Sequence, residues 1–192
     1  MASTRGRPAA TSHAAIEQAA FRLFARDGFD PTTLEDIAEE VGVARRTLTR
    51  YYRSKNDIPW GQFDRTLAHF AALLDAMPAD LPVWECVHRG VLAFNDFPTD
   101  ASPSHEERMR LILQTPALQA HSVLRYADWR AVITEFVARR TGLASYDVLP
   151  RTAGHVSLAL ALTAYETWLD DATTSLPDLL EEAMRSLRSY LS

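Results

Sequence analysis

Apolar residues recur along the chain with the period of an α-helix, and no window alternates apolar and polar residues as a half-buried strand does. Residues 32–42 are the clearest example. Either Thr32 or Thr33 can cap this helix at its start, and Gly42 can end it. Its apolar positions follow the i, i+3, i+4, i+7 spacing of a single helix face: Leu34, Ile37, Ala38 and Val41.

Prolines and glycines divide the rest of the chain into further helices. A first helix is predicted over residues 12–27 and a short one over 44–51. A longer helix is expected to begin near residues 55–57 and to continue to Ala76, with Pro59 in its first turn, where proline is tolerated. Five more are predicted near residues 82–96, 103–114, 116–141, 146–170 and 175–191. The predicted fold is therefore all-α, with about nine helices.

Composition narrows the class of protein. The chain has 192 residues, 47% of them hydrophobic and 23% charged, which is typical of a globular protein and excludes a mainly disordered chain. Cys86 is its only cysteine, so a disulfide scaffold is excluded. No apolar run reaches the ~18 residues of a membrane helix, and the first residues lack the apolar stretch of a secretory signal. We therefore expect no membrane contact and a cytoplasmic location.

Residues 32–52 combine an amphipathic helix, a glycine turn and a second short helix, which is the pattern of a helix-turn-helix. In this motif the second helix enters the major groove of DNA with its first residues against the base edges. Val43, Leu48 and Tyr52 can anchor that helix to the core. Five polar residues remain to face outward: Arg45, Arg46, Thr47, Thr49 and Arg50.

The distribution of charge supports the same function. The net charge is −5, yet residues 1–55 carry nine Lys and Arg against seven Asp and Glu. Between Val41 and Asn56 there is no acid, and five basic residues fall within eleven positions: Arg45, Arg46, Arg50, Arg53 and Lys55. The alternative is a solvated basic helix face, which is the usual meaning of a charge run. The helix-turn-helix around this run favours DNA binding.

The run from Ala20 to Ile58 resembles the DNA-binding domain of the TetR family of transcriptional regulators. The resemblance covers about the first third of the chain and lies in these residues: Ala20, Leu23, Phe24, Gly28, Phe29, Thr32, Thr33, Leu34, Ile37, Ala38, Val41, Gly42, Val43, Thr47, Leu48, Tyr51, Tyr52, Lys55 and Ile58. The length and the all-helical remainder agree with the family. Residues 1–10 are small, polar and basic and include Pro8, which predicts a disordered basic tail. The resemblance implies a DNA-binding domain over 11–58 and an effector-binding and dimerisation domain over 59–192.

The family pattern also assigns roles to single residues. It implies that Arg45, Arg46 and Thr47 begin the reading helix, and that Tyr51 and Lys55 contact phosphates. Lys55 is also expected to begin a helix whose amides can bind a phosphate. The candidate DNA-binding set is Thr33, Arg45, Arg46, Thr47, Thr49, Arg50, Tyr51 and Lys55. Thr49 replaces the usual tyrosine and Arg46 an often small residue, which leaves the operator sequence open.

A narrower resemblance begins at Ser54. Residues 54–64 are similar to the branch of this family associated with mycofactocin biosynthesis clusters, and the sequence Pro59-Trp60-Gly61 is unusual at a helix start. The resemblance implies a regulator of genes for a peptide-derived redox cofactor, with an acyl-CoA-type ligand as one candidate inducer.

The last two predicted helices suggest a dimer. The helix over 146–170 is apolar on two faces and the helix over 175–191 carries a near-heptad stripe, so that two copies can form a four-helix bundle. The candidate interface residues are Leu158, Ala161, Leu162, Tyr165, Leu180, Met184 and Leu187. The alternative is that both helices are core within one chain.

Large apolar residues on the middle helices suit either a core or a pocket for an acyl chain. The candidate pocket residues are Trp60, Phe63, Trp84, His88, Phe94, Met109, Arg125 and Trp129. Arg125 can pair with a ligand phosphate or lie solvated, and His88 and Asn95 suit a polar pocket or a satisfied core equally.

Catalytic and metal motifs are missing from the sequence. Cys86 and His88 are two residues apart, which places them on different helix faces, and the six histidines show no metal-ligand spacing. No metal or cofactor is expected. Together with the helix-turn-helix and the apolar faces of the last two helices, the resemblance to the TetR family implies a ligand-responsive homodimeric repressor of a palindromic operator. Its alternatives are a constitutive DNA-binding dimer without an effector and a small helical enzyme.

Overall fold

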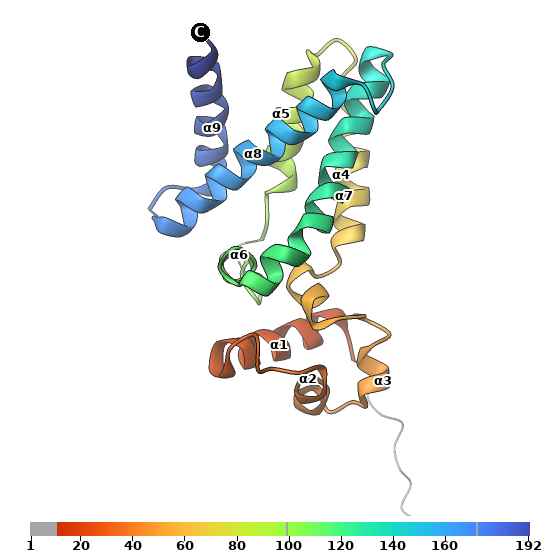
Figure 1. The fold of residues 1–192 in the computed structure, drawn as a ribbon, viewed down its shortest axis with the longest axis vertical. Helices are drawn as coiled ribbons and strands as arrows, with labels where there is room; N and C mark the ends of the chain where they lie inside the picture. Colours follow the sequence, from red (N-terminus) through yellow and green to blue (C-terminus); the bar gives the residue numbers. More distant parts are fainter. Residues whose placement is uncertain (1–10, 99, 172) are drawn as a thin grey trace, which may run out of the picture. The chain divides into compact units, whose positions relative to one another are not determined.

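The computed structural model of the chain describes residues 11–98, 100–171 and 173–192, and every regular element in these residues is helical (Figure 1). The all-α prediction is confirmed. The predicted tail, residues 1–10, lies outside the described residues. The elements are α1 (His13–Asp27), α2 (Leu34–Val41), α3 (Arg45–Leu48), the 3-10 helix η1 (Lys55–Trp60), α4 (Phe63–Asp75), α5 (Val83–Phe94), α6 (His105–Gln114), α7 (Pro116–Thr141), α8 (Val148–Asp170) and α9 (Leu176–Leu191).

The chain forms two compact units. The first comprises residues up to Gln62 together with Asp100–Leu118, and the second comprises Phe63–Thr99 together with Gln119–Ser192. Helix α6 therefore packs with the helix-turn-helix, although its sequence lies between two helices of the second unit. The sequence predicted one boundary, after residue 58, because a local pattern does not show which distant helix completes a core. The division of functions between 11–58 and 59–192 stays a prediction.

The first unit has a core to which α1, α2, α3 and η1 all contribute. Ile16, Ile37, Leu48 and Ile58 are fully buried, one from each of these helices. The cluster is completed by Ala20, Leu23, Phe24, Phe29, Ala38, Tyr52 and Leu118. Every apolar position that marked the predicted helix face over 34–41 packs in this core or against it.

The prediction of one continuous helix over residues 55–76 is wrong, because the segment forms two helices that are separated by a turn. Residues 55–60 form η1, and Gly61 then turns the chain at a φ of 58° before α4 begins. Pro59 has no N–H to donate, and a Cβ at Gly61 would lie 3.3 Å from Nη1 of Arg108. The first turn thus ends in a left-handed residue that only glycine adopts without cost.

In the second unit α9 packs on α8, and both contact α5. Within this unit Phe70 of α4 packs between α5 and α7 in an aromatic cluster, with its ring centroid 4.9 Å from that of Phe94 and 5.6 Å from that of Trp129. Helix α8 approaches α7 closely at Gly154, where a Cβ would lie 3.0 Å from the carbonyl oxygen of Arg130. Among the described helices, none is long and apolar enough to cross a membrane.

Candidate nucleic-acid interface

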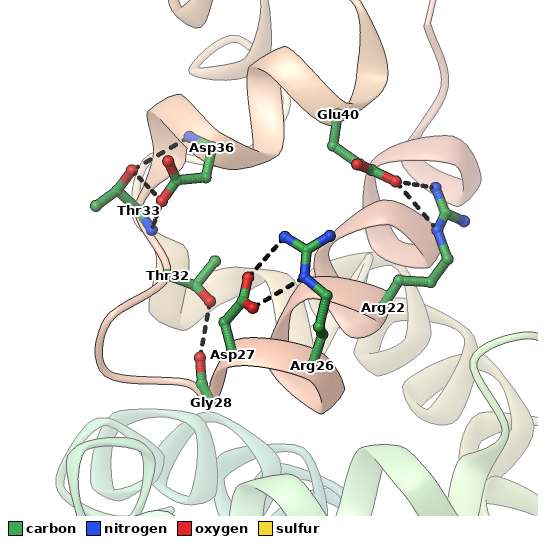
Figure 2. A network of polar contacts seen from close by, with 8 residues as sticks. All are labelled: Arg22, Arg26, Asp27, Gly28, Thr32, Thr33, Asp36 and Glu40. Carbon is green, nitrogen blue, oxygen red and sulfur yellow. Dashed lines mark hydrogen bonds and ion pairs between the residues drawn. The ribbon is translucent and has the colours of Figure 1, made fainter.

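The start of α2 is fixed by a reciprocal cap between Thr33 and Asp36 (Figure 2). The Thr33 N–H and hydroxyl each donate to Oδ2 of Asp36 at 2.8 Å, and the Asp36 N–H donates to Oγ1 of Thr33 at 3.2 Å. These bonds from Thr33 hold the pKa of the Asp36 carboxyl below its usual value. Because Thr33 stays exposed, α2 presents a positioned threonine at its first turn.

The turn after α2 and the short α3 follow the predicted pattern. Gly42 adopts the left-handed conformation, with φ 74° and ψ 33°, and the Val43 N–H donates to the carbonyl of Ala38 at 2.9 Å. Leu48 of α3 is completely buried and Tyr52 is 3% exposed, so both anchor the short helix as predicted.

Anchoring one side of α3 leaves its basic residues at the surface. Arg45, Arg46 and Arg50 are exposed, whereas Thr47 and Thr49 are half-buried. The Thr49 hydroxyl donates to the carbonyl of Arg46 at 3.1 Å, so it closes the end of its own helix. Arg45 Nε lies 2.9 Å from Oε1 of Glu35, in an ion pair whose side chains are 60% and 58% exposed. Such a pair contributes only ~0–1 kcal/mol, so a phosphate or a base edge can replace Glu35 at little cost.

The side chains of Tyr51 and Lys55 both bind backbone carbonyls of the first unit. The Tyr51 hydroxyl donates to the carbonyl of Thr11 at 2.6 Å. Lys55 Nζ donates to the carbonyls of Phe29 at 2.6 Å and Asp30 at 3.0 Å, and burial lowers the pKa of this amine. The family resemblance implies that both residues contact DNA phosphates, and that role stays a prediction.

The prediction that Lys55 begins a long helix is wrong, and the phosphate site expected at its first amides stays a prediction. Residues 55–60 form the short η1 helix rather than the start of a long helix. The Asn56 N–H already donates to Oγ of Ser54 at 3.1 Å, and the Asp57 N–H donates to the Ser54 carbonyl at 3.1 Å. Two of the amides that a phosphate could bind are therefore already paired within the chain.

A cleft of about 610 Å³ lies between α1 and α2. Its lining residues are Leu23, Arg26, Asp27, Pro31, Thr32, Asp36, Glu39 and Glu40. Figure 2 shows two ion pairs beside it, Arg26 with Asp27 at 2.8 Å and Arg22 with Glu40 at 3.0 Å. The lining carries four carboxylates and one arginine, and this excess of negative charge disfavours DNA phosphates at the cleft.

Sequence reasoning missed a buried polar cluster behind α3. Glu17, Tyr52 and Arg108 meet in the first unit, with Glu17 9% exposed as a residue. Glu17 shares a helix face with Ala20 and Phe24, and an acid at such a core position is the signal that could have indicated a buried partner. The partner, Arg108, is 91 residues away, and no local pattern connects the two.

The candidate pocket residues lie in both units. Trp60 and Met109 belong to the first unit, and the other six belong to the second. Within the second, Phe94 and Trp129 pack together with ring centroids 6.1 Å apart, and Arg125 lies 3.2 Å from the Asp64 carboxylate and over the ring of Phe63.

Two candidate pocket residues of α5 face α9 instead. Trp84 is half exposed and has the guanidinium of Arg188 4.1 Å from its ring centroid. His88 Nε2 lies 3.0 Å from Oε2 of Glu181 and lines a cavity of about 20 Å³, too small for an effector. The effector pocket stays a prediction.

The candidate dimer residues divide by burial. Ala161, Tyr165 and Leu180 are 5%, 6% and 4% exposed within the single chain, and the Tyr165 hydroxyl donates to Oδ1 of Asn95. These three side chains therefore belong to the core of the second unit. The predicted dimer interface wrongly included them, because they are already covered within one chain. Four are half-buried on α8 and α9 and stay candidates: Leu158, Leu162, Met184 and Leu187.

Comparison with known proteins identifies the family. The model of the bacterial regulatory proteins of the tetR family matches residues 16–58, and that of the MftR C-terminal domain matches residues 81–192. The chain belongs to the TetR family. It is a DNA-binding transcriptional regulator and not an enzyme, as predicted.

Two relatives place this TetR-family regulator more closely. It is 46% identical over 178 residues to MftR of Mycobacterium tuberculosis, a candidate mycofactocin biosynthesis transcriptional regulator, covering 93% of this chain and 90% of the relative. It is 30% identical to the HTH-type transcriptional regulator TcmR of Streptomyces glaucescens, covering 90% and 80% of the two chains. The resemblance to the mycofactocin branch is thereby confirmed.

A solved structure supports the fold. The TetR-family repressor FadR of Thermus thermophilus, in complex with lauroyl-CoA, superimposes with a TM-score of 0.58 over 91% of this chain and 92% of its own. At 20% identity this likeness concerns the fold.

Proposed function

We propose that this TetR-family regulator is a homodimeric repressor, acting in the cytoplasm, that binds a palindromic operator and releases it when an acyl-CoA-type effector binds. Its targets would be mycofactocin-related genes. The observation that carries the DNA-binding part is the anchored α3, whose arginines are exposed beside a capped α2. The 46% identity to MftR of M. tuberculosis supports the target genes.

In the proposed complex α3 lies in the major groove. Arg45, Arg46 and Thr47, at its first turn, read base edges, while Arg50 and the capped Thr33 contact the flanking backbone. The planar guanidinium of an arginine can donate two hydrogen bonds to one guanine, which is the commonest specific contact in DNA recognition. Lys55 and Tyr51 support this arrangement by holding the chain on either side of the helix-turn-helix.

The proposed dimer pairs two such units on one operator. Two α3 helices must reach successive major grooves, so the protein needs a two-fold partner. The half-buried Leu158, Leu162, Met184 and Leu187 supply apolar surface on α8 and α9 for that contact. A groove of about 380 Å³ between the two helices, lined partly by Leu160, continues this surface.

The effector class rests on chemistry and on fold similarity. The second unit is rich in aromatic side chains, and Arg125 lies beside the ring of Phe63. An acyl chain suits aromatic surroundings, and an arginine suits the phosphates of coenzyme A. The FadR structure in complex with lauroyl-CoA shares the fold. Release then follows from population shift, because an effector that binds one state better displaces the DNA-bound state.

A chain-length series of acyl-CoA thioesters tests the proposal. Operator release is followed by fluorescence anisotropy, and binding is followed by calorimetry. Each buried methylene contributes ~0.8 kcal/mol, or roughly fourfold in affinity, until the pocket is full. Higher salt should weaken binding without moving the optimal length. Flat affinity across the series, or tight binding without release, rejects the acyl-CoA effector. Mass spectrometry of the native protein then identifies any co-purified ligand.

A further inference from the structure

A carboxylate is buried in the first unit between three parts of the chain. The Glu17 side chain, on α1, is only 12% exposed. Its Oε1 accepts a hydrogen bond of 2.5 Å from the hydroxyl of Tyr52, and its Oε2 accepts one of 2.6 Å from Nη2 of Arg108 on α6. Burial, and next the bond to Glu17, raises the pKa of the Tyr52 hydroxyl above its usual value, so Tyr52 stays a donor. Three side chains thus form one closed cluster.

Arg108 also binds the main chain that follows the helix-turn-helix. Its Nη1 donates to the carbonyl of Pro59 at 2.6 Å and lies 3.4 Å from the carbonyl of Ile58. Its guanidinium lies 5.3 Å from the ring centroid of Phe21. Gly61 leaves room for it, because a Cβ there would lie 3.3 Å from Nη1. One guanidinium therefore joins α6 to α1 and to both carbonyls at the centre of η1.

The topology gives this contact its importance. The segment that contains α6 packs in the first unit, but the segments immediately before and after it belong to the second. Helix α6 is thus covalently connected to the second unit at both ends and bound to the DNA-binding unit by Arg108. On the same helix Arg110 pairs with Glu106 at 3.0 Å, but those side chains are 42% and 43% exposed. An exposed pair of this kind constrains little.

We propose that the Glu17–Tyr52–Arg108 cluster is a positioning site for operator binding. It holds α6 against the helix-turn-helix and sets the path of the chain immediately after α3, without touching DNA. Tyr52 directly follows Arg50 and Tyr51, so its attachment to Glu17 fixes where those residues stand. Without Arg108 the Glu17 carboxylate would be buried with no counter-charge, and it would have to turn towards water and release Tyr52.

The test compares Arg108→Met with the matched control Arg110→Met. The probes are a duplex enriched with the wild-type protein from a randomised library and a random-sequence duplex of the same length. Affinities are measured at a temperature at which circular dichroism shows every variant to be folded. Arg108→Met should weaken binding to the enriched duplex about tenfold and leave random-duplex binding nearly unchanged. Arg110→Met should change neither. A positioning defect lowers the ratio of specific to non-specific affinity, whereas loss of folded protein lowers both together.

Two further variants test the same cluster if Arg108→Met folds poorly. Tyr52→Phe keeps the ring in the core and removes only the hydroxyl, and it should lower the same ratio to a smaller extent. Glu17→Gln combined with Arg108→Met should cost no more than the worse single variant, because both act through one cluster. The proposal would be overturned if the double variant lost affinity by the product of the two single-variant factors. It would also be overturned if Arg108→Met and Arg110→Met had the same ratio of specific to non-specific affinity.

Discussion

Replacement of Arg45 gives the clearest test of whether α3 of this regulator contacts base edges in DNA. In the structure its guanidinium pairs with Glu35 at the surface, with 60% and 58% of the two side chains exposed. Replacing Arg45 with alanine therefore removes a pair worth only ~0–1 kcal/mol to folding. If Arg45 donates to a base edge, the same change costs ~1–3 kcal/mol in operator affinity, or about 5- to 150-fold. The two magnitudes differ enough to be separated.

A matched control is available in Arg22→Ala. Arg22 pairs with Glu40 at 3.0 Å, with 61% and 33% of the side chains exposed, but it lies on α1 beside the acidic cleft (Figure 2). Both alanine variants should melt close to wild type, and only Arg45→Ala should lose operator binding in an anisotropy titration. Glu35→Gln should tighten binding by up to about fivefold, because it frees Arg45 and removes an anion near phosphate.

The reasoning fails if Arg45→Ala and Arg22→Ala lose equal affinity. It also fails if Arg45→Ala weakens the operator and a random duplex by the same factor, because a contact with a base edge acts on sequence preference. In the second case Arg45 would be a phosphate contact, and the docking of α3 would have to be revised.

Further outcomes are expected from single changes elsewhere. Thr33→Ala should destabilise the protein by ~1 kcal/mol in denaturant unfolding through loss of the α2 cap. Thr33 holds the pKa of the Asp36 carboxyl in the folded protein below its ordinary value of 3.8. The part of the stability loss that comes from this carboxylate should therefore be present above pH 3.8 and disappear as the pH falls through the lower pKa of the folded state. A stability loss that does not depend on pH would contradict this explanation. Lys55→Met should lower stability by ~1–3 kcal/mol, since two carbonyls lose a charged donor, and an unchanged thermal melt would refute that role. Leu162→Glu should yield monomers in analytical ultracentrifugation and weaken operator binding, and a wild-type monomer at micromolar concentration would reject the interface.

Much of the DNA-binding unit could be predicted from the sequence because its determinants are local. The period of Leu34, Ile37 and Ala38 defines one face of one helix, and a cap is decided by residues three apart, as Thr33 and Asp36 are. Gly42 is the residue that a left-handed turn prefers. Family resemblance added the roles of Arg45 and its neighbours, because these depend on a motif rather than on distant packing.

Tertiary structure decided what depends on residues far apart in the chain. Only folding brings Arg108 to Glu17, closes the space beside Gly61 and places α6 in the first unit. An apolar stripe on α8 or α9 is the same whether its partner is another helix of the chain or a second copy, so burial alone showed that Tyr165 of α8 and Leu180 of α9 lie inside. A pattern of one or two turns specifies which side of a helix is buried, and long-range packing specifies what covers it.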